Sequence, residues 1–513
     1  MRWSWAAVCG LVLGLAVADT ATAAPALVRI HDGALRGVVA GGVATFKDIP
    51  FAAPPVGRLR WRAPQPPAPW RGVRDATAYG PECLQMASLG RVRPGVQQSE
   101  DCLTLNVFTP AHRPAGARLP VMVWIYGGAF ILGSADFYDG TRFAQDGVVL
   151  VTFNYRLGRL GFFADPALAK TNPEGALSDY GFADQIAALK WVKRNIAAFG
   201  GDPNAVTIFG ESAGAISVNY LMVSPAARGL FIRAASESGF GRTEGHPLAE
   251  AEATGASFMQ GLGVSGEDAA AAKAMRALPA SAVMAPVKGL GDAGTGPIVD
   301  GVIVKESPGE GFARGDEARV PYLAGGNSYE ASLFPDVASH PEAVLDRLGA
   351  AKDAAVAPYG GGDPARAVAA LTTLRTVIEP DRYLARQNAK RGIPAYLYYF
   401  SYLPDAQRAT AMGVRHGGEI GYVFDTLPKT DVSYGAFHMP AATPADEAIA
   451  KAMHAYIVAF GKTGRPDAAG GPRWPRAEPG DVVMEFGDDG PQVRPDFDRA
   501  KLDPLSARAE AGR

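Results

Sequence analysis

Apolar residues in the first half of the chain form two patterns that alternate between residues 119 and 222. Unbroken apolar runs rich in β-branched residues occupy 121–125, 148–153 and 205–209. Such runs are typical of strands buried on both faces of a parallel sheet. Over 179–199 the apolar residues recur every three or four positions, which predicts a helix. Strands alternating with helices predict an α/β fold with a large, mostly parallel central sheet flanked by helices.

The ends of the predicted helices carry start and stop signals. Asp179 stands at the N-cap position of the first helix, and two glycines follow its last turn. The later half of the chain is less regular, with helical spacing over 248–261 and 444–460. Before the second of these, Thr443 is a suitable N-cap, and the proline after it suits the first helical position. We expect these later segments to be cap and C-terminal elements packed around the same sheet.

The first 23 residues predict an export signal. A basic start precedes a mostly apolar run over 5–18, and the cleavage pattern A-x-A follows at 21–23. A membrane span needs about 20 unbroken apolar residues, and Asp19 interrupts this run too early. We therefore expect a signal peptide over 1–23 and a secreted or periplasmic mature domain over 24–513.

Composition and charge exclude several kinds of partner. With 48% hydrophobic and 20% charged residues, the chain resembles an ordinary globular protein. A net charge of -2 provides no basic surface for nucleic acid or anionic membrane. The C-terminal segment has no hydrophobic tail of the kind that precedes a lipid anchor. No metal-ligand spacing or phosphate-binding glycine loop is present, so we expect neither metal nor organic cofactor. The sequence carries no signal for the oligomeric state.

Two cysteines, Cys83 and Cys102, remain once the signal is removed. In a protein bound for an oxidising compartment, cysteines this close in sequence are expected to pair. They would close a loop of about 20 residues, for which chain-entropy theory gives roughly 3 kcal/mol. The alternative is two unrelated buried thiols.

A Gly-Glu-Ser-Ala-Gly motif at 210–214 follows the third predicted strand and precedes a helical segment. This strand-turn-helix setting is that of a nucleophile elbow, in which small neighbours allow a sharp turn that exposes the serine hydroxyl. The five residues alone are weak evidence, because Gly and Ser are common in turns. Their context predicts that Ser212 is a nucleophile.

A second glycine-containing segment, at 126–130, follows the strand that ends at Ile125. Acyl transfer needs backbone N–H groups that stabilise the oxyanion formed on the attacked carbonyl. A simple glycine turn is the competing interpretation, but the position upstream of the elbow favours an oxyanion hole. We expect its donors to be Gly128, Ala129 and Ala213.

Several long motifs in the same order resemble the type B carboxylesterase and cholinesterase family over nearly the whole mature length. They read FKDIPFAAPPVG at 46–57, EDCLTLNV at 100–107 and FGESAGA at 209–215. The resemblance implies an α/β-hydrolase fold, ester hydrolysis, and a triad of Ser, Glu and His. It also matches Cys83 and Cys102 to the family's first disulfide, whereas its other usual cysteines are absent.

A serine hydroxyl needs a base, and in this fold the chain order is Ser, acid, His. His416 lies in GVRHGGEI at 413–420, which resembles the family's catalytic-histidine loop. Without that resemblance it would rank no higher than any loop histidine. The other histidines after Ser212 have no such setting: His246, His340, His438 and His454.

The acid of a triad orients the imidazole and stabilises its charged form. Glu330 ends GGNSYE at 325–330, which matches the family segment that carries the catalytic glutamate. By spacing alone, Asp300 and Asp316 remain open alternatives.

Three further residues align with the supporting polar network of the family: Glu211, Ser238 and Glu419. Hydrogen bonds of this kind keep a catalytic site preorganised. The alternative for each is a solvated side chain.

The resemblance and the motifs together predict hydrolysis of a small-molecule carboxylic ester through an acyl-Ser212 intermediate. Amide or peptide hydrolysis by the same triad is one alternative. A binding protein of the same fold is another, but such relatives have lost the nucleophile. Specificity lies in loops that carry no motif, where Phe130, Tyr138 and Phe424 either line an apolar substrate site or belong to the core.

The loop between the cysteines bears on choline esters. In the cholinesterases of this family, a Trp in the corresponding loop binds the quaternary ammonium by a cation–π interaction. Residues 84–101 contain no aromatic residue. Arg91 and Arg93 would repel a cation if they face the cleft; their alternative is a solvated surface position. We therefore expect no preference for choline esters.

Overall fold

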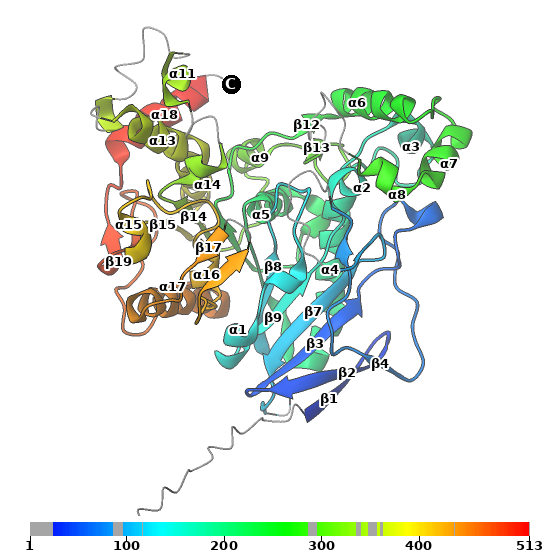
Figure 1. Ribbon diagram of the computed structural model, residues 1–513, viewed down its shortest axis with the longest axis horizontal. Coiled ribbons are helices and arrows are strands. Elements are labelled where there is room, and N and C mark those ends of the chain that lie inside the picture. Colours follow the sequence, from blue (N-terminus) through cyan, green and yellow to red (C-terminus); the bar gives the residue numbers. More distant parts are fainter. Residues whose placement is uncertain are drawn as a thin grey trace, which may run out of the picture.

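The computed structural model describes residues 24–85, 96–114, 116–285, 295–334, 340–346, 357–359, 363–434 and 437–511. Arg91 and Arg93 lie outside these residues. A 13-stranded sheet runs through the molecule, with helices on both of its faces (Figure 1).

The centre of the sheet is parallel, as the unbroken apolar runs predict. In spatial order its strands are β9 (Val149–Phe153), β8 (Leu119–Ile125), β10 (Gly201–Glu211), β11 (Arg233–Glu237), β14 (Tyr322–Asn327), β15 (Ala395–Phe400) and β18 (Val483–Gly487). Residues 121–125 of β8 are completely buried, because helices cover both faces of these strands.

Antiparallel strands complete both edges of the sheet. They are β1 (Ala24–Ile30), β2 (Gly33–Ala40), β3 (Val43–Pro50) and β7 (Thr104–Pro110) on one side and β19 (Gly490–Arg494) on the other, with β4 (Val73–Asp75) paired to β2. Three short pairs lie outside the main sheet: β5 (Glu82–Cys83) with β6 (Gln98–Ser99), β12 (His246–Pro247) with β13 (Ile298–Val299), and β16 (Val432–Tyr434) with β17 (Phe437–Met439).

Long and short helices alternate along the chain, and several of the long ones pack against the main sheet. The long ones are α4 (Tyr180–Asn195), α5 (Ala213–Val223), α6 (Leu248–Gly261), α13 (Pro364–Thr373), α14 (Glu379–Lys390), α17 (Pro444–Thr463) and α18 (Arg499–Ala511). The short ones are α1 (Thr141–Gln145), α2 (Gly158–Gly161), α3 (Pro166–Thr171), α7 (Ala269–Ala277), α8 (Ala280–Val283), α9 (Pro308–Arg314), α11 (Pro341–Asp346), α15 (Asp405–Arg408) and α16 (Ile420–Val423).

The α/β-hydrolase fold is thereby confirmed, and so are several helix ends. Helix α6 has the predicted bounds, and α17 begins at Pro444. The Thr443 hydroxyl accepts the N–H of Asp446 (3.3 Å) in a capping box. Gly200, with φ of 83°, ends the helical segment that begins with α4.

Asp179 is the N-cap residue of α4, as predicted, but the expected side-chain cap is absent. Its side chain makes no cap hydrogen bond to α4 and instead accepts the N–H of Ile298 at 3.0 Å. The residue is completely buried between the helix and the segment around β13. Its carboxyl group therefore joins two distant parts of the chain rather than satisfying the first turn of its own helix.

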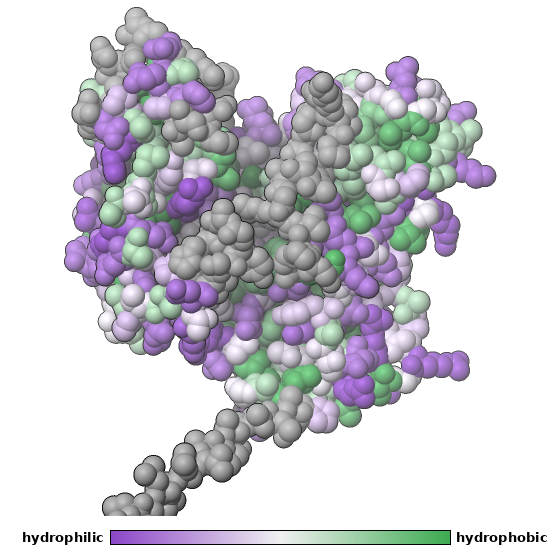
Figure 2. Space-filling view, in the orientation of Figure 1, coloured by the Kyte–Doolittle hydropathy of each residue, from purple (hydrophilic) through white to green (hydrophobic). Residues whose placement is uncertain are grey.

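Two groups of helices stand apart on one side of the molecule. One contains α6, α7 and α8, and the other contains α11, α13 and α18 (Figure 1). The surface is hollowed between them (Figure 2). Among the described residues, no helix is long and apolar enough to cross a membrane, and no group of His, Cys, Asp or Glu side chains is arranged to hold a metal ion.

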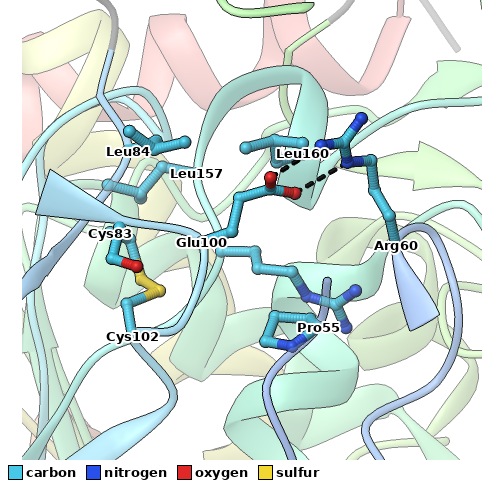
Figure 3. A pocket seen from close by; sticks show the side chains of 10 residues that line it. Pro55, Arg60, Cys83, Leu84, Glu100, Cys102, Leu157 and Leu160 are labelled. Atoms are coloured by element: carbon cyan, nitrogen blue, oxygen red, sulfur yellow. Dashed lines mark hydrogen bonds and ion pairs between the residues drawn. A yellow bond between two sulfur atoms is a disulfide. The ribbon is translucent and has the colours of Figure 1, made fainter. Parts of the chain in front are cut away.

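Cys83 and Cys102 form a disulfide, and both are buried. Beside it, the Arg60 guanidinium binds both oxygens of Glu100, at 2.7 and 2.6 Å (Figure 3). Arg60 also donates to the carbonyl of Leu278 at 2.6 Å. The disulfide therefore closes the cysteine loop. The ion pair connects the end of that loop to Arg60 and, through Arg60, to the segment after α7.

Candidate active site

Ser212 occupies the turn between β10 and α5, with φ of 56° and ψ of −125°. A positive φ is strained for a residue with a Cβ atom, and the close packing of the turn maintains it. A Cβ on Gly214 would lie 1.9 Å from the carbonyl oxygen of Ile125, and one on Gly210 would lie 2.4 Å from the same atom. Both flanking positions therefore require glycine, which is the physical basis of the motif.

The glycine-containing turn after β8 lies against the elbow. A Cβ on Gly127 would come within 2.8 Å of the Cβ of Ser212. The next two residues, Gly128 and Ala129, have φ of 111° and 53°. Helix α5 begins at Ala213, where the backbone N–H groups of a first turn have no intrahelical partner. The structure thus brings together the two segments that hold the expected oxyanion donors.

The imidazole of His416 lies between two glutamates. Its Nδ1 is 2.5 Å from Oε2 of Glu330, and its Nε2 is 3.0 Å from Oε1 of Glu211. The backbone N–H of His416 donates to the Ser332 hydroxyl at 2.9 Å, which fixes the loop. Nε2 makes no hydrogen bond within the described part of the chain. That nitrogen therefore lies beside the carboxylate of Glu211, the residue that immediately precedes Ser212.

Glu330 is completely buried and rigidly held. Its Oε1 accepts the Ser238 hydroxyl at 2.6 Å and the backbone N–H of Asn327 at 2.7 Å. Only Oε2 is left for the imidazole. The structure therefore joins His416 to this glutamate.

The two aspartates that spacing left open lie elsewhere. Asp300 accepts backbone N–H groups from 178 and 302–304. Asp316 forms an ion pair with Arg314. Neither contacts the histidine.

The three expected supporting residues converge on this site. The Ser238 hydroxyl lies 3.4 Å from Glu419 as well as 2.6 Å from Glu330. Glu419 and Glu211 are buried, so none of the three is a solvated side chain.

Sequence reasoning missed other members of the network. The Asn327 side chain donates to Glu419 and its backbone to Glu330, so one residue orients both carboxylates. Asp381 of α14 accepts the N–H groups of Gly239 (3.4 Å) and Gly241 (3.2 Å), the loop that follows Ser238. Asn327 lies in the same GGNSYE segment as Glu330, which is the one local signal for it. Asp381 has no local signal, because it comes from a distant helix.

Burial and mutual charge shift the acid–base properties of the cluster. Burial disfavours the imidazolium of His416, but the carboxylates of Glu211 and Glu330 outweigh it and raise its pKa to about 9. Burial raises the pKa of Glu211 to about 7, and burial together with Glu211 and Glu330 raises that of Glu419 to about 8. Carboxyl groups that share a buried site with one imidazole thus compete for protons near neutral pH.

The other histidines after Ser212 lie on other elements. His246 is exposed in β12, and His340 is exposed before α11. His438 lies in β17. His454 of α17 bonds the carbonyl of Val423 and the carboxylate of Asp146.

Of the aromatic residues considered for a substrate site, Phe130 packs against Phe162 and Phe182 in the core. Tyr138 and Phe424 pack around Trp124 at ring distances of 5.1 and 4.9 Å. Phe424 is buried, so its ring belongs to the core rather than to an open pocket wall.

Comparison with known proteins identifies the family. The sequence model of the carboxylesterase family matches residues 24–353 and 360–499. The chain belongs to the carboxylesterase family. It is 39% identical to fumonisin B1 esterase of Sphingopyxis macrogoltabida over 479 residues, which cover 90% of this chain and 87% of that protein. It is 34% identical to the liver carboxylesterase of Sus scrofa over 504 residues, 87% of this chain and 85% of that one.

Solved structures of carboxylesterases agree with the fold. A PNB esterase superposes with a TM-score of 0.77 and 31% identity, and a Geobacillus stearothermophilus carboxylesterase with 0.80 and 33%. Each alignment covers 93% of this chain and 99% of the other. This carboxylesterase is therefore a carboxylic ester hydrolase. The alternative hypothesis, a binding protein of the same fold, is rejected.

Proposed function

We propose that this chain is a secreted serine carboxylesterase that cleaves small-molecule esters through an acyl-Ser212 intermediate. In the first step His416 Nε2 takes the proton of the Ser212 hydroxyl while the oxygen attacks the ester carbonyl. The N–H groups of Gly128, Ala129 and Ala213 stabilise the oxyanion. The C–O bond to the alcohol then breaks, and His416 returns the proton to the leaving alcohol.

In the second step a water molecule replaces the alcohol. His416 takes one of its protons, the resulting hydroxide attacks the acyl carbonyl, and the bond to Ser212 breaks with return of a proton to the serine. Glu330 accepts the Nδ1–H bond throughout, so that Nε2 stays in the tautomer that works as a base. No cofactor is needed for either step.

One observation carries this proposal. His416 is held by a buried glutamate through Nδ1, while its other nitrogen lies beside Glu211, the residue that precedes Ser212 in the strained elbow. A carboxylate, an imidazole and a serine in a strained turn are the three groups that an activated serine requires.

The test is covalent labelling with a fluorophosphonate, which reacts with activated serines. We expect one adduct per chain in the wild type and none in Ser212→Ala, which keeps the fold because the elbow accepts a smaller side chain. Ester turnover by the variant should fall by about 10³-fold or more. Labelling at another residue, or near wild-type turnover in the variant, would overturn the assignment.

Ester and amide hydrolysis share the acyl intermediate and differ in the leaving group. A matched ester and anilide of one acyl group therefore separate them, and we expect the ester to be cleaved with the higher kcat/KM. Fumonisin B1 and cocaine, named for two relatives, are suitable first compounds for a wider substrate panel.

Export is the remaining part of the proposal. We expect N-terminal sequencing of protein from the secreted or periplasmic fraction to begin at Ala24. An exported protein that still begins at Met1 would contradict the signal peptide.

A further inference from the structure

One buried carboxyl group beside the proposed triad has no assigned role. Glu237, the last residue of β11, is completely buried. Neither of its carboxyl oxygens has a hydrogen-bond partner among the described residues. An ionised carboxylate in such a position loses its hydration without compensation, which is strongly unfavourable.

Glu237 occupies the centre of the site. Strand β11 lies between β10 and β14, and the register places Glu237 opposite Glu211 on one side and Gly325 on the other. Because paired residues of parallel strands project to the same face, the side chains of Glu237 and Glu211 are neighbours. The carbonyl oxygen of Glu237 also accepts the N–H of Ser212 at 2.9 Å. Its backbone therefore holds the nucleophile while its carboxyl group enters the buried network.

The groups around it are mostly acidic. Burial, then Glu419 and Glu211, raise the pKa of Glu237 well above its usual range. On β15, the Tyr398 phenol is buried and has no hydrogen-bond partner in the part of the chain that the structure describes. Burial, with Glu419 and Glu237, raises its pKa. The titratable groups that face this region from the surrounding elements are Tyr138, Glu211, Glu330, Asp381, Tyr398, His416 and Glu419.

Charge balance distinguishes Glu237 from its neighbours. Glu330 and Glu419 accept hydrogen bonds from donors, and Glu211 lies against the imidazole. Each of these three therefore has a partner that favours its ionised form, whereas Glu237 has none among the described residues. A carboxylic acid that keeps its proton has one O–H donor, and the carboxylates of Glu211 and Glu419 are the acceptors around it.

We propose that Glu237 is a neutral carboxylic acid whose O–H donates to the neighbouring carboxylates, which makes it a positioning residue that favours the ionised forms of Glu211 and Glu419 beside His416. This inference rests on the proposed triad. It follows that Glu237 sets the number of negative charges around the imidazole. The pH at which the base becomes active then depends on a residue that does not touch it.

Two variants of Glu237 test the proposal through the pH profile of kcat/KM on a neutral ester. Glu237→Gln keeps the shape of the side chain and an uncharged hydrogen-bond donor. We therefore expect the acid limb of its profile, the fall in kcat/KM at low pH, to coincide with that of the wild type. Glu237→Met keeps the length but removes the donor. Glu211 or Glu419 then takes up a proton, fewer negative charges face His416, and the acid limb shifts to lower pH by about one unit.

Opposite results overturn the inference. If Glu237 were ionised, Glu237→Gln would itself shift the acid limb to lower pH, because it would remove a negative charge. An unshifted limb in Glu237→Met would exclude the donor role. Glu317→Gln is the matched control, because Glu317 is also buried but lies before β14, beside Arg391. The acid limb of the pH profile of this variant should not move.

An infrared measurement is independent of catalysis. We expect the difference spectrum between wild type and Glu237→Gln at neutral pH to contain the carbonyl band of a protonated carboxylic acid. Absence of that band overturns the inference even if Glu237→Met fails to fold. If fluorophosphonate does not label the wild type, the proposed function itself is refuted. Failure of the proposed function and failure of this inference are therefore distinguishable.

Discussion

At the proposed site, single residues adopt a conformation or a charge that their local environment disfavours. Ser212 keeps a strained φ in a turn so closely packed that both flanking positions require glycine. His416 is buried and surrounded by carboxylates, so its charged form is stabilised although burial opposes it. The same environment that orients the imidazole thus makes it a stronger base, which holds its proton to higher pH.

Replacement of the triad acid tests the orientation of the imidazole. In Glu330→Gln, the amide oxygen must stay at Oε1, because Ser238 and the N–H of Asn327 both donate there. The NH2 group of the glutamine then faces Nδ1 of His416, which must accept a hydrogen bond from it. The ring proton is then on Nε2, so this nitrogen can no longer take the serine proton. We expect kcat to fall by about 10³–10⁴-fold with little change in melting temperature.

Steady-state kinetics and a thermal melt measure the two effects. Glu510→Gln, an exposed position in α18, is the matched control and should keep wild-type kcat. A Glu330→Gln variant with full activity would show that another group orients the histidine.

The pH profile tests the charge around His416. Catalysis needs the neutral imidazole, and a raised pKa means that the ring stays protonated to higher pH. We therefore expect kcat/KM to fall as pH drops, with a midpoint above the ordinary value of a histidine, about 6.5. In Glu211→Gln the loss of one carboxylate should move the midpoint to lower pH, since Glu211 is the largest raising influence.

Buffers of constant ionic strength and an uncharged substrate keep other titrations out of this measurement. A flat profile from mildly acidic to mildly alkaline pH would contradict the role of His416. An unmoved midpoint in Glu211→Gln would contradict the charge argument.

At the scale of elements, the site depends on contacts between segments that are distant in sequence. Helix α16 follows the His416 loop directly, and His454 of α17 joins it to α1. The Nδ1 atom of His454 is 2.7 Å from the carbonyl of Val423, and its Nε2 is 3.0 Å from the carboxylate of Asp146. Both partners are hydrogen-bond acceptors. A residue that looked like an ordinary helix position thus connects three helices.

His454→Leu should therefore destabilise the protein. The variant has an apolar side chain of similar bulk, but it loses the contacts of the imidazole with the Val423 carbonyl and Asp146. We expect a loss of about 1–3 kcal/mol in the free energy of unfolding, measured by chemical denaturation. The matched control His340→Leu, at an exposed position, should have little effect. Equal stability of both variants would show that the three-helix connection is not stabilising.

The disulfide is a second connection between elements. Cys83 and Cys102 are 19 positions apart, so chain-entropy theory assigns the closed loop roughly 3 kcal/mol. We expect the double variant Cys83→Ala/Cys102→Ala to unfold at lower denaturant concentration while it keeps its kcat, because neither sulfur contacts the proposed triad. Two free thiols titrated in the native mature protein would rule out the bridge.

At the scale of the whole molecule, the parallel sheet assembles the site. The elbow, the oxyanion turn, Ser238 and the Glu330 loop follow β10, β8, β11 and β14, four adjacent strands. Because parallel strands end at the same edge, segments far apart in sequence meet there. Specificity then depends on the loops around that edge.

Choline esters provide a test at this scale. Residues 84–101 contain no aromatic residue, so the loop lacks the ring that would bind a quaternary ammonium, an interaction of about 0.5–2 kcal/mol. We expect kcat/KM for neutral esters to be at least as high as for choline esters with the same acyl group. A marked preference for the choline ester in that comparison would show that another part of the chain binds the cation.

Local sequence pattern determined what depends on neighbouring residues. Apolar runs predicted the central strands, the Thr443 cap predicted the start of α17, and the glycines around Ser212 predicted the elbow. Each of these follows from backbone sterics or from burial on one element. The family motifs added the pairing of His416 with Glu330, which spacing alone left open against two aspartates.

Only the tertiary structure decided what depends on surroundings. Asp179 carries the local signal of a helix cap, yet it is buried against the segment around β13 and bonds there instead. Glu237 looks like any acidic residue at a strand end, and Asp381 like any in a helix; both become part of the site through strands and helices far away in sequence. The physical reason is that a carboxyl group's charge and partners are set by burial and by nearby charges, which a one-dimensional pattern does not contain.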